Sequence, residues 1–195
     1  MNTAENLRFN RAKITFKDEC IDVFMYFREA DTYPFRISVD CWQLDWQVSS
    51  AVQISSALSQ VSSAVEHLTL RHGVHSQSSE EHNDVDRIEW RKLLGSFSNM
   101  NALRVKDGLV EQVSRCLQLE DGELPLNLLP ELQELTYDGS GDAGDAFTPF
   151  IDARHNTGHP VTLVREGSSS SPSSSSSQLP AITFVSGEAV DDAEI

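Results

Sequence analysis

The sequence predicts an α/β fold: short parallel strands alternate with helices in an irregular right-handed solenoid with a curved parallel sheet and outer helices. Two observations support this prediction. Apolar residues recur in spaced pairs at six places, and most of the intervening segments have helical periodicity. A single strand–helix unit cannot bury its own apolar face, so successive units are expected to stack around one core. Crossovers between parallel strands are almost always right-handed, which sets the expected hand.

Each expected strand carries two apolar residues separated by one position, so both side chains point to the same face of the sheet. The first members of successive pairs are 23 to 35 positions apart, which suits an irregular repeat. The main competing fold, a doubly wound sheet, requires uninterrupted apolar strands, whereas the apolar residues of these strands alternate with other residues. The segment IDVFMYFREADTYP fits either a helix or a strand. The expected strand cores are Ile14-x-Phe16, Ile37-x-Val39, Leu68-x-Leu70, Leu103-x-Val105, Leu135-x-Tyr137 and Val161-x-Leu163.

The segments between these strands mostly predict helices. Apolar faces run through residues 48–61 and 110–117. Thr148 and Pro149 suit the start of a later helix, and Gly158 suits its end, because glycine readily adopts the left-handed conformation found there. The clearest helical stripe has apolar residues at i, i+3, i+4 and i+7, namely Trp90, Leu93, Leu94 and Phe97.

Length and composition predict one folded domain, residues 1–166, followed by a tail. The chain has 195 residues, of which 39% are hydrophobic and 23% charged, as in an ordinary globular domain. Residues 168–178 read SSSSPSSSSSQ, which cannot bury enough apolar surface to fold. Residues 167–195 are therefore expected to be a disordered, Ser-rich, acidic tail. It contains one short apolar segment, ITFV at 182–185.

The formal net charge of −15 argues against several classes of partner. Nucleic acids and anionic membranes both attract cationic proteins, so neither is an expected partner. No apolar stretch approaches the roughly 18 residues of a membrane span, and the N-terminus lacks the apolar core of a signal peptide. Three cysteines without metal-type spacing suggest reduced thiols, so we expect a cytoplasmic or nuclear protein.

One glycine motif meets the requirements of a dinucleotide site in part. Residues 139–144 read GSGDAG, after an expected strand and before an expected helix, with Glu166 further on. Asp138, Asp142 and Asp145 flank it and would repel a pyrophosphate, so we interpret it as a flexible loop. Two pairs of histidines have spacings that a metal could use, His72 with His75 and His155 with His159, but neither pair has a further metal ligand. The sequence also contains no motif of a catalytic nucleophile. We therefore expect no cofactor, no metal site and no enzymatic activity.

Four stretches carry a resemblance to a known family: VEHLTL (65–70), EWRKLLGSFSNMNALRV (89–105), LVEQVSRCLQLEDGELPLNLLPELQELTYDGSG (109–141) and FIDARHNTGHPVTLV (150–164). They resemble the C-terminal repeat region of fungal F-box/leucine-rich-repeat proteins, over roughly residues 11–166. The resemblance implies a leucine-rich-repeat-like solenoid. In that family an N-terminal F-box docks the adaptor of an SCF-type ubiquitin ligase, and the repeats are presumed to select the client protein.

We expect no F-box within this sequence, because repeat material begins within about a dozen residues of Met1. The string Leu129-Pro130-Glu131-Leu132 looks similar to the opening of an F-box but runs into an expected strand, so we interpret it as a repeat linker. A ubiquitin-ligase adaptor is thus a partner only if an F-box lies upstream. A nucleotide-binding enzyme using the Gly139–Gly144 loop, and a truncated fragment without independent function, remain the alternatives.

The outward positions of the stacked strands would form one concave surface. Of the fifteen such positions on the first five strands, six are basic and three acidic, which gives +3 on a chain of −15. We therefore hypothesise that this face holds an acidic or phosphorylated segment of another protein, with arginine as a bidentate donor. A solvated face of mixed charge is the simpler explanation. The candidate partner-binding residues are Lys13, Lys17, Arg36, His67, Thr69, Arg71, Arg104, Lys106, Glu134 and Thr136.

Overall fold

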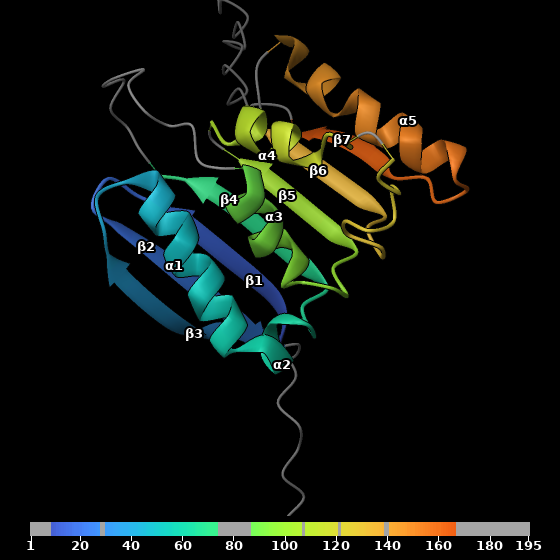
Figure 1. The fold of residues 1–195 in the computed structure, drawn as a ribbon. Coiled ribbons are helices and arrows are strands. Elements are labelled where there is room, and N and C mark those ends of the chain that lie inside the picture. Colours follow the sequence, from blue (N-terminus) through green and yellow to red (C-terminus); the bar gives the residue numbers. More distant parts are fainter. Residues whose placement is uncertain are drawn as a thin grey trace, which may run out of the picture.

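The computed structural model describes residues 9–27, 30–73, 87–106, 108–120, 122–138 and 141–166 of the chain. These residues form one open, mostly parallel sheet with the order β3-β2-β1-β4-β5-β6-β7 (Figure 1). Neighbouring strands from β1 through β4 to β7 are parallel, whereas β2 pairs antiparallel with both β1 and β3. The α/β class and the predominance of parallel pairing are confirmed.

The strands are β1 (Phe9–Phe16), β2 (Cys20–Phe27), β3 (Ala30–Asp40), β4 (His67–His72), β5 (Ala102–Lys106), β6 (Glu134–Asp138) and β7 (Thr162–Glu166). The helices are α1 (Leu44–Ala57), α2 (Ser59–Ser62), α3 (Arg87–Gly95), α4 (Val110–Leu117) and α5 (Thr148–Asn156), with a 3-10 helix, η1 (Gly141–Phe147), before α5. The strands cover five of the six expected cores, and β7 begins one residue after Val161.

The described helices lie on one face of the sheet, and the core is the layer between them and the strands (Figure 1). Alternate strand residues point into this layer, so that Leu68, Leu103 and Leu135 form an in-register row of buried side chains. The predicted stripe of α3 is confirmed: Trp90 is 1% exposed, and Leu93, Leu94 and Phe97 are fully buried. One-sided helical cover is what the alternating strands require.

The N-terminal strands differ from the predicted stack of parallel neighbours. The ambiguous segment forms β2 and the start of β3, so the strand with Ile37 and Val39 lies at the edge of the sheet rather than between β1 and β4. Only residues 17–19 connect β1 to β2. A connection this short permits antiparallel pairing, whereas parallel neighbours need a crossover of about a dozen residues.

A buried arginine fixes the loop that precedes β6. The side chain of Arg154, on α5, is 1% exposed and donates hydrogen bonds to the carbonyl oxygens of Leu129 (3.0 Å), Pro130 (3.1 Å), Leu132 (3.0 Å) and His159 (3.3 Å). The Leu129–Leu132 string therefore forms a connection before a strand, as predicted, and not the start of a helical segment.

Several predictions fall on residues outside the described part of the chain. These are the disordered tail at 167–195 and, with it, the domain boundary at 166. In the part that is described, no helix is both long enough and apolar enough to cross a membrane.

Candidate interaction surface

The face of the sheet opposite the helices, called the open face below, carries the outward side chains of the strands. His67, Arg71 and Arg104 are exposed there, whereas the inward residues of the same strands are buried. Eight of the ten candidate residues lie together on β1, β4, β5 and β6 of this face: Lys13, His67, Thr69, Arg71, Arg104, Lys106, Glu134 and Thr136.

The expected cores of β1 and β4 are offset by two residues in the sheet. Ile14 pairs with Leu70 rather than with Leu68, so Lys13 lies beside Thr69 and Arg11 lies beside His67. The cation Arg11, which was not among the ten candidate residues, therefore also lies on the open face. The alternation of Ala12 and Ile14 already indicated that β1 extends back to this residue.

The other two candidates, Lys17 and Arg36, are held by an acid on β2. The Lys17 ammonium lies 2.5 Å from one carboxylate oxygen of Asp22, and the Arg36 guanidinium lies 2.7 Å from the other. The Asp22 side chain is 1% exposed. Burial acts to raise its pKa, but hydrogen bonds from these two cations outweigh burial and lower it. Because both cations neutralise an internal carboxylate, they are poorly available to a partner.

Glu166 engages two further cations of the open face. This last residue of β7 forms ion pairs with Arg104 and, at 2.7 Å, with Lys106, both on β5. The contact spans β6, where Thr136 pairs with Arg104 and Asp138 pairs with Glu166. A partner that used these two cations would have to displace the Glu166 carboxylate. Extending the strand alternation from Val164 to Glu166 would have found this acid in the sequence.

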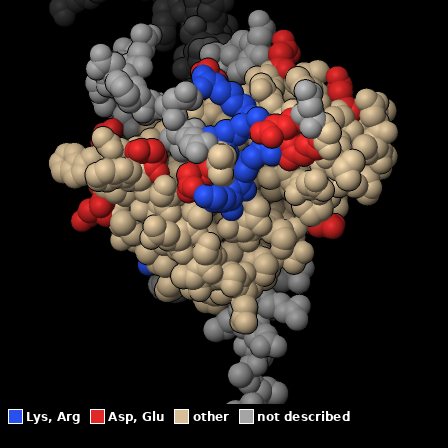
Figure 2. Space-filling model, viewed as in Figure 1, with Lys and Arg blue, Asp and Glu red and all other residues tan. Residues whose placement is uncertain are grey.

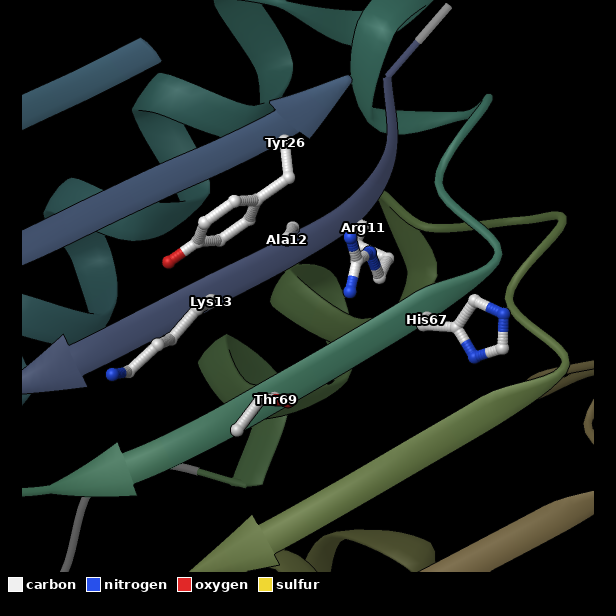
Figure 3. A pocket seen from close by; sticks show the side chains of 6 residues that line it. All are labelled: Arg11, Ala12, Lys13, Tyr26, His67 and Thr69. Atoms are coloured by element: carbon white, nitrogen blue, oxygen red, sulfur yellow. The ribbon is translucent and has the colours of Figure 1, made fainter. Parts of the chain in front are cut away.

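A shallow pocket of about 290 Å³ lies on the open face where β2, β1 and β4 adjoin. Figure 3 shows Tyr26, Arg11, Lys13, His67 and Thr69 around it, contributed by three neighbouring strands. Two of these side chains are cations, three can donate hydrogen bonds without carrying a permanent charge, and none is acidic. The pocket thus brings two cations and three neutral donors to one part of the open face.

Aromatic rings on β2 support the cations near this pocket. The guanidinium carbon of Arg11 lies 5.8 Å from the centre of the Tyr26 ring. Lys13 Nζ and the guanidinium carbon of Arg36 lie 5.9 Å and 5.5 Å from the centre of the Phe24 ring. Such contacts are worth about 0.5–1 kcal/mol each at exposed sites and restrict where the cations can lie. The pocket is therefore partly preorganised for an anion.

Comparisons with known proteins give no independent guide to function. No family model, no curated protein and no solved structure matches this chain. The resemblance to F-box/leucine-rich-repeat proteins accordingly stays a prediction, and the functional argument rests on the chemistry of the open face.

The helix-covered face has a different distribution of charge. Figure 2 shows Lys and Arg in one band over α3 and α4, with carboxylates beside it. On α3, Arg91 donates hydrogen bonds to both carboxylate oxygens of Glu123, at 2.6 and 2.8 Å, and to the carbonyl oxygen of Cys116 at 2.9 Å. The hydrogen bonds raise the pKa of Arg91 and lower that of Glu123. This band joins α3 to the chain after α4, which gives it a structural role.

The described part of the glycine motif, residues 141–144, begins a 3-10 helix, whereas residues 139 and 140 of the predicted flexible loop lie outside the described part of the chain. Residues 141–147 form η1, and Gly144 is buried against Tyr137. A Cβ at Gly144 would collide with the Tyr137 hydroxyl group. Close packing therefore explains this glycine without a nucleotide.

The thiols and histidines also show no constellation for chemistry. No group of three or more His, Cys, Asp or Glu in the described ranges could hold a metal ion. Burial raises the pKa of the Cys116 thiol to about 12, so it remains protonated near neutral pH and is a poor nucleophile. His75 of the first histidine pair lies outside the described residues.

Proposed function

We propose that this chain is a non-enzymatic protein-interaction module whose open face binds an acidic or phosphorylated segment of another protein. The pocket between β2, β1 and β4 carries the proposal, because it gathers Arg11 and Lys13 with neutral donors and has no acidic lining residue. A carboxylate or phosphate group entering it would form charge-assisted hydrogen bonds, which are shorter and stronger than neutral ones.

The negative net charge of the chain does not contradict an acidic partner. Charges separated by more than the Debye length, about 8–10 Å at physiological salt, are largely screened. The potential near the pocket is therefore set mainly by its own cations, Arg11 and Lys13, because the arginines on β3 and β5 are paired with the carboxylates of Asp22 and Glu166. Local complementarity of this kind gives specificity and orientation more than raw affinity.

The proposed architecture is a short leucine-rich-repeat-like, right-handed solenoid, in which β4 to β7 are the strands of successive units. The in-register parallel pairing of these strands and the helices on one face support it. In such a solenoid the helix-free face is the recurrent binding surface. If an F-box lies upstream, the module would recognise the client of an SCF-type ubiquitin ligase.

The proposal can be tested without knowing the partner. A randomised peptide display library is selected on the immobilised protein, and binding of enriched peptides is measured by fluorescence anisotropy. We expect enrichment of Asp and Glu. The double charge reversal Lys13→Glu with Arg71→Glu should weaken binding at least about tenfold, which corresponds to about 1.4 kcal/mol.

The matched control places the same two reversals on the opposite side of the molecule. Lys92→Glu with Arg115→Glu changes the net charge equally, and both side chains are more than half exposed on helices. It should leave peptide affinity within about twofold of the wild type, because exposed charges beyond a Debye length are screened. Enriched peptides without acidic residues, or equal losses in both double variants, would refute the proposed surface.

A further inference from the structure

The outer edge of β7 offers backbone hydrogen-bonding groups to another strand. β7 is last in the sheet order, so no described strand pairs with this edge. The Thr162 N–H donates to the Gln133 carbonyl oxygen at 2.8 Å, on the side of β6. Because successive residues of a strand direct these groups to opposite sides, the N–H groups of Leu163 and Arg165 point to the outer edge. Unpaired edges of this kind are templates for strand addition.

The apolar core is also incomplete at this edge. In the row that runs across the parallel strands, Leu68 and Leu103 are 1% exposed and Leu135 is fully buried, but Leu163 is only partly buried. The next row ends at Arg165, which is exposed beside Tyr137. An additional strand would cover the side of Leu163 that faces away from β6.

The sequence of the chain beyond β7 contains a segment that suits this position. Residues 181–185 read AITFV, and the tripeptide Ile182-Thr183-Phe184 is identical to Ile14-Thr15-Phe16 of β1. In β1, both Ile14 and Phe16 are fully buried in the core layer, while Thr15 points to the open face. The same tripeptide sequence therefore already forms part of a strand in this sheet.

The connecting chain is long enough for either direction of pairing. Fourteen residues, 167–180, separate the end of β7 from residue 181. A parallel crossover needs about a dozen residues, and fourteen can span up to about 45 Å when extended. A tether of this length gives an effective concentration in the millimolar range, which favours pairing within one molecule over pairing between molecules.

We propose that residues 181–185 dock on the outer edge of β7 as an additional parallel strand. Ile182 then lies beside Leu163 and completes the apolar row, and Phe184 lies beside Arg165, where ring and guanidinium can make a cation–π contact. Thr183 lies beside Val164, on the open face. This docking does not depend on the proposed function.

The test is hydrogen exchange of the full chain, followed by mass spectrometry of peptides that contain β7. The variant Ile182→Asp with Phe184→Asp should exchange its β7 amides about tenfold faster than the wild type. The control Ala189→Asp with Val190→Asp adds the same charge to the same tail and should exchange like the wild type. Unchanged exchange in the first variant would overturn the proposal.

Two further measurements distinguish other occupants of the edge. A chain with Val164→Cys and Thr183→Cys should form an intramolecular disulfide on mild oxidation in higher yield than one with Val164→Cys and Ser174→Cys; equal yields would overturn the docking. Light scattering should show a monomer with concentration-independent protection of β7. Protection that appears only in a dimer would assign the edge to a second copy of the chain and would likewise overturn the proposal.

Discussion

Replacing Arg154 tests whether the loop before β6 depends on one buried guanidinium. Burial lowers the pKa of Arg154, but the side chain stays charged at neutral pH. Arg154→Met keeps an unbranched chain and removes every donor. The carbonyl oxygens of Leu129 and Leu132 then lose hydrogen bonds that lie in buried surroundings. Leu129 also has a φ of 56°, a left-handed conformation that costs a leucine about 1–2 kcal/mol.

The magnitude follows from the two buried acceptors. Leaving a buried acceptor without a partner costs about 1–3 kcal/mol, which gives about 2–6 kcal/mol for the pair. Part of this loss in stability is offset, because the folded variant no longer has to desolvate a guanidinium. We therefore expect Arg154→Met to lower the free energy of unfolding by about 2–4 kcal/mol. Arg154→Lys, which keeps the charge but loses the planar fork, should lose somewhat less.

Urea denaturation followed by far-UV circular dichroism measures this change. The control is Arg115→Met on α4, where the guanidinium is half exposed and pairs with Glu111 one turn away. Exposed pairs of this kind contribute about 0.3–0.5 kcal/mol, so the control should change stability little. A loss below about 1 kcal/mol for Arg154→Met would show that water replaces the guanidinium and that the loop is not held as argued.

Four shorter predictions concern other parts of the molecule. Gly144→Ala should lower the melting temperature by several degrees, because its Cβ would collide with Tyr137 and such overpacking costs about 1–3 kcal/mol; an unchanged melting temperature would contradict the packing. Asp22→Asn should destabilise the protein by about 1.5–3 kcal/mol at neutral pH, since a hydrogen bond to a charged group contributes this much. Because the folded pKa of Asp22 is lowered, denaturation at several pH values should show this difference begin to shrink as the pH falls below about 4, the ordinary pKa of an aspartate, and disappear only below the lower pKa of the folded state. Cys116 should resist iodoacetamide at pH 8 in the folded protein and react after unfolding, as peptide mass spectrometry can show, because its pKa is raised to about 12. Finally, Glu166→Gln should strengthen binding of acidic peptides about two- to fivefold in the anisotropy assay, because it releases two cations from an exposed ion pair of about 1 kcal/mol; weaker binding would mean that Glu166 itself contributes to recognition.

Local patterns were sufficient to predict most elements of the fold. The apolar stripe of α3 and the apolar pairs of β4 and β5 recur with the periods of a helix and of a strand, respectively. Gly158, with a φ of 79°, follows α5 as the glycine rule requires. These features depend on neighbours in the sequence, so the sequence alone identifies them.

The pairing of β1 could not be predicted in the same way. Ala12, Ile14 and Phe16 provide three inward positions for two inward leucines on β4, and the pattern does not say which two align. The two-residue offset leaves the same side chains on the open face and changes their neighbours, so that Arg11 lies beside His67 and Lys13 lies beside Thr69. Asp22 and Glu166 were not among the candidates because their ion pairs also depend on strand pairing. Asp22 lies in the segment that fitted either a helix or a strand, and Glu166 contacts Arg104 from a strand that is distant in sequence.

The alternation of β4 and β5 separates the residues that determine stability from those that determine what the surface contacts. Leu68 and Leu103 face the helices, while Thr69 and Arg104, one position later, face water. Substitutions at surface positions of this kind usually change stability by less than about 0.5 kcal/mol. Evolution can therefore rewrite the recognition chemistry of this sheet residue by residue while the hydrophobic layer beneath it stays constant.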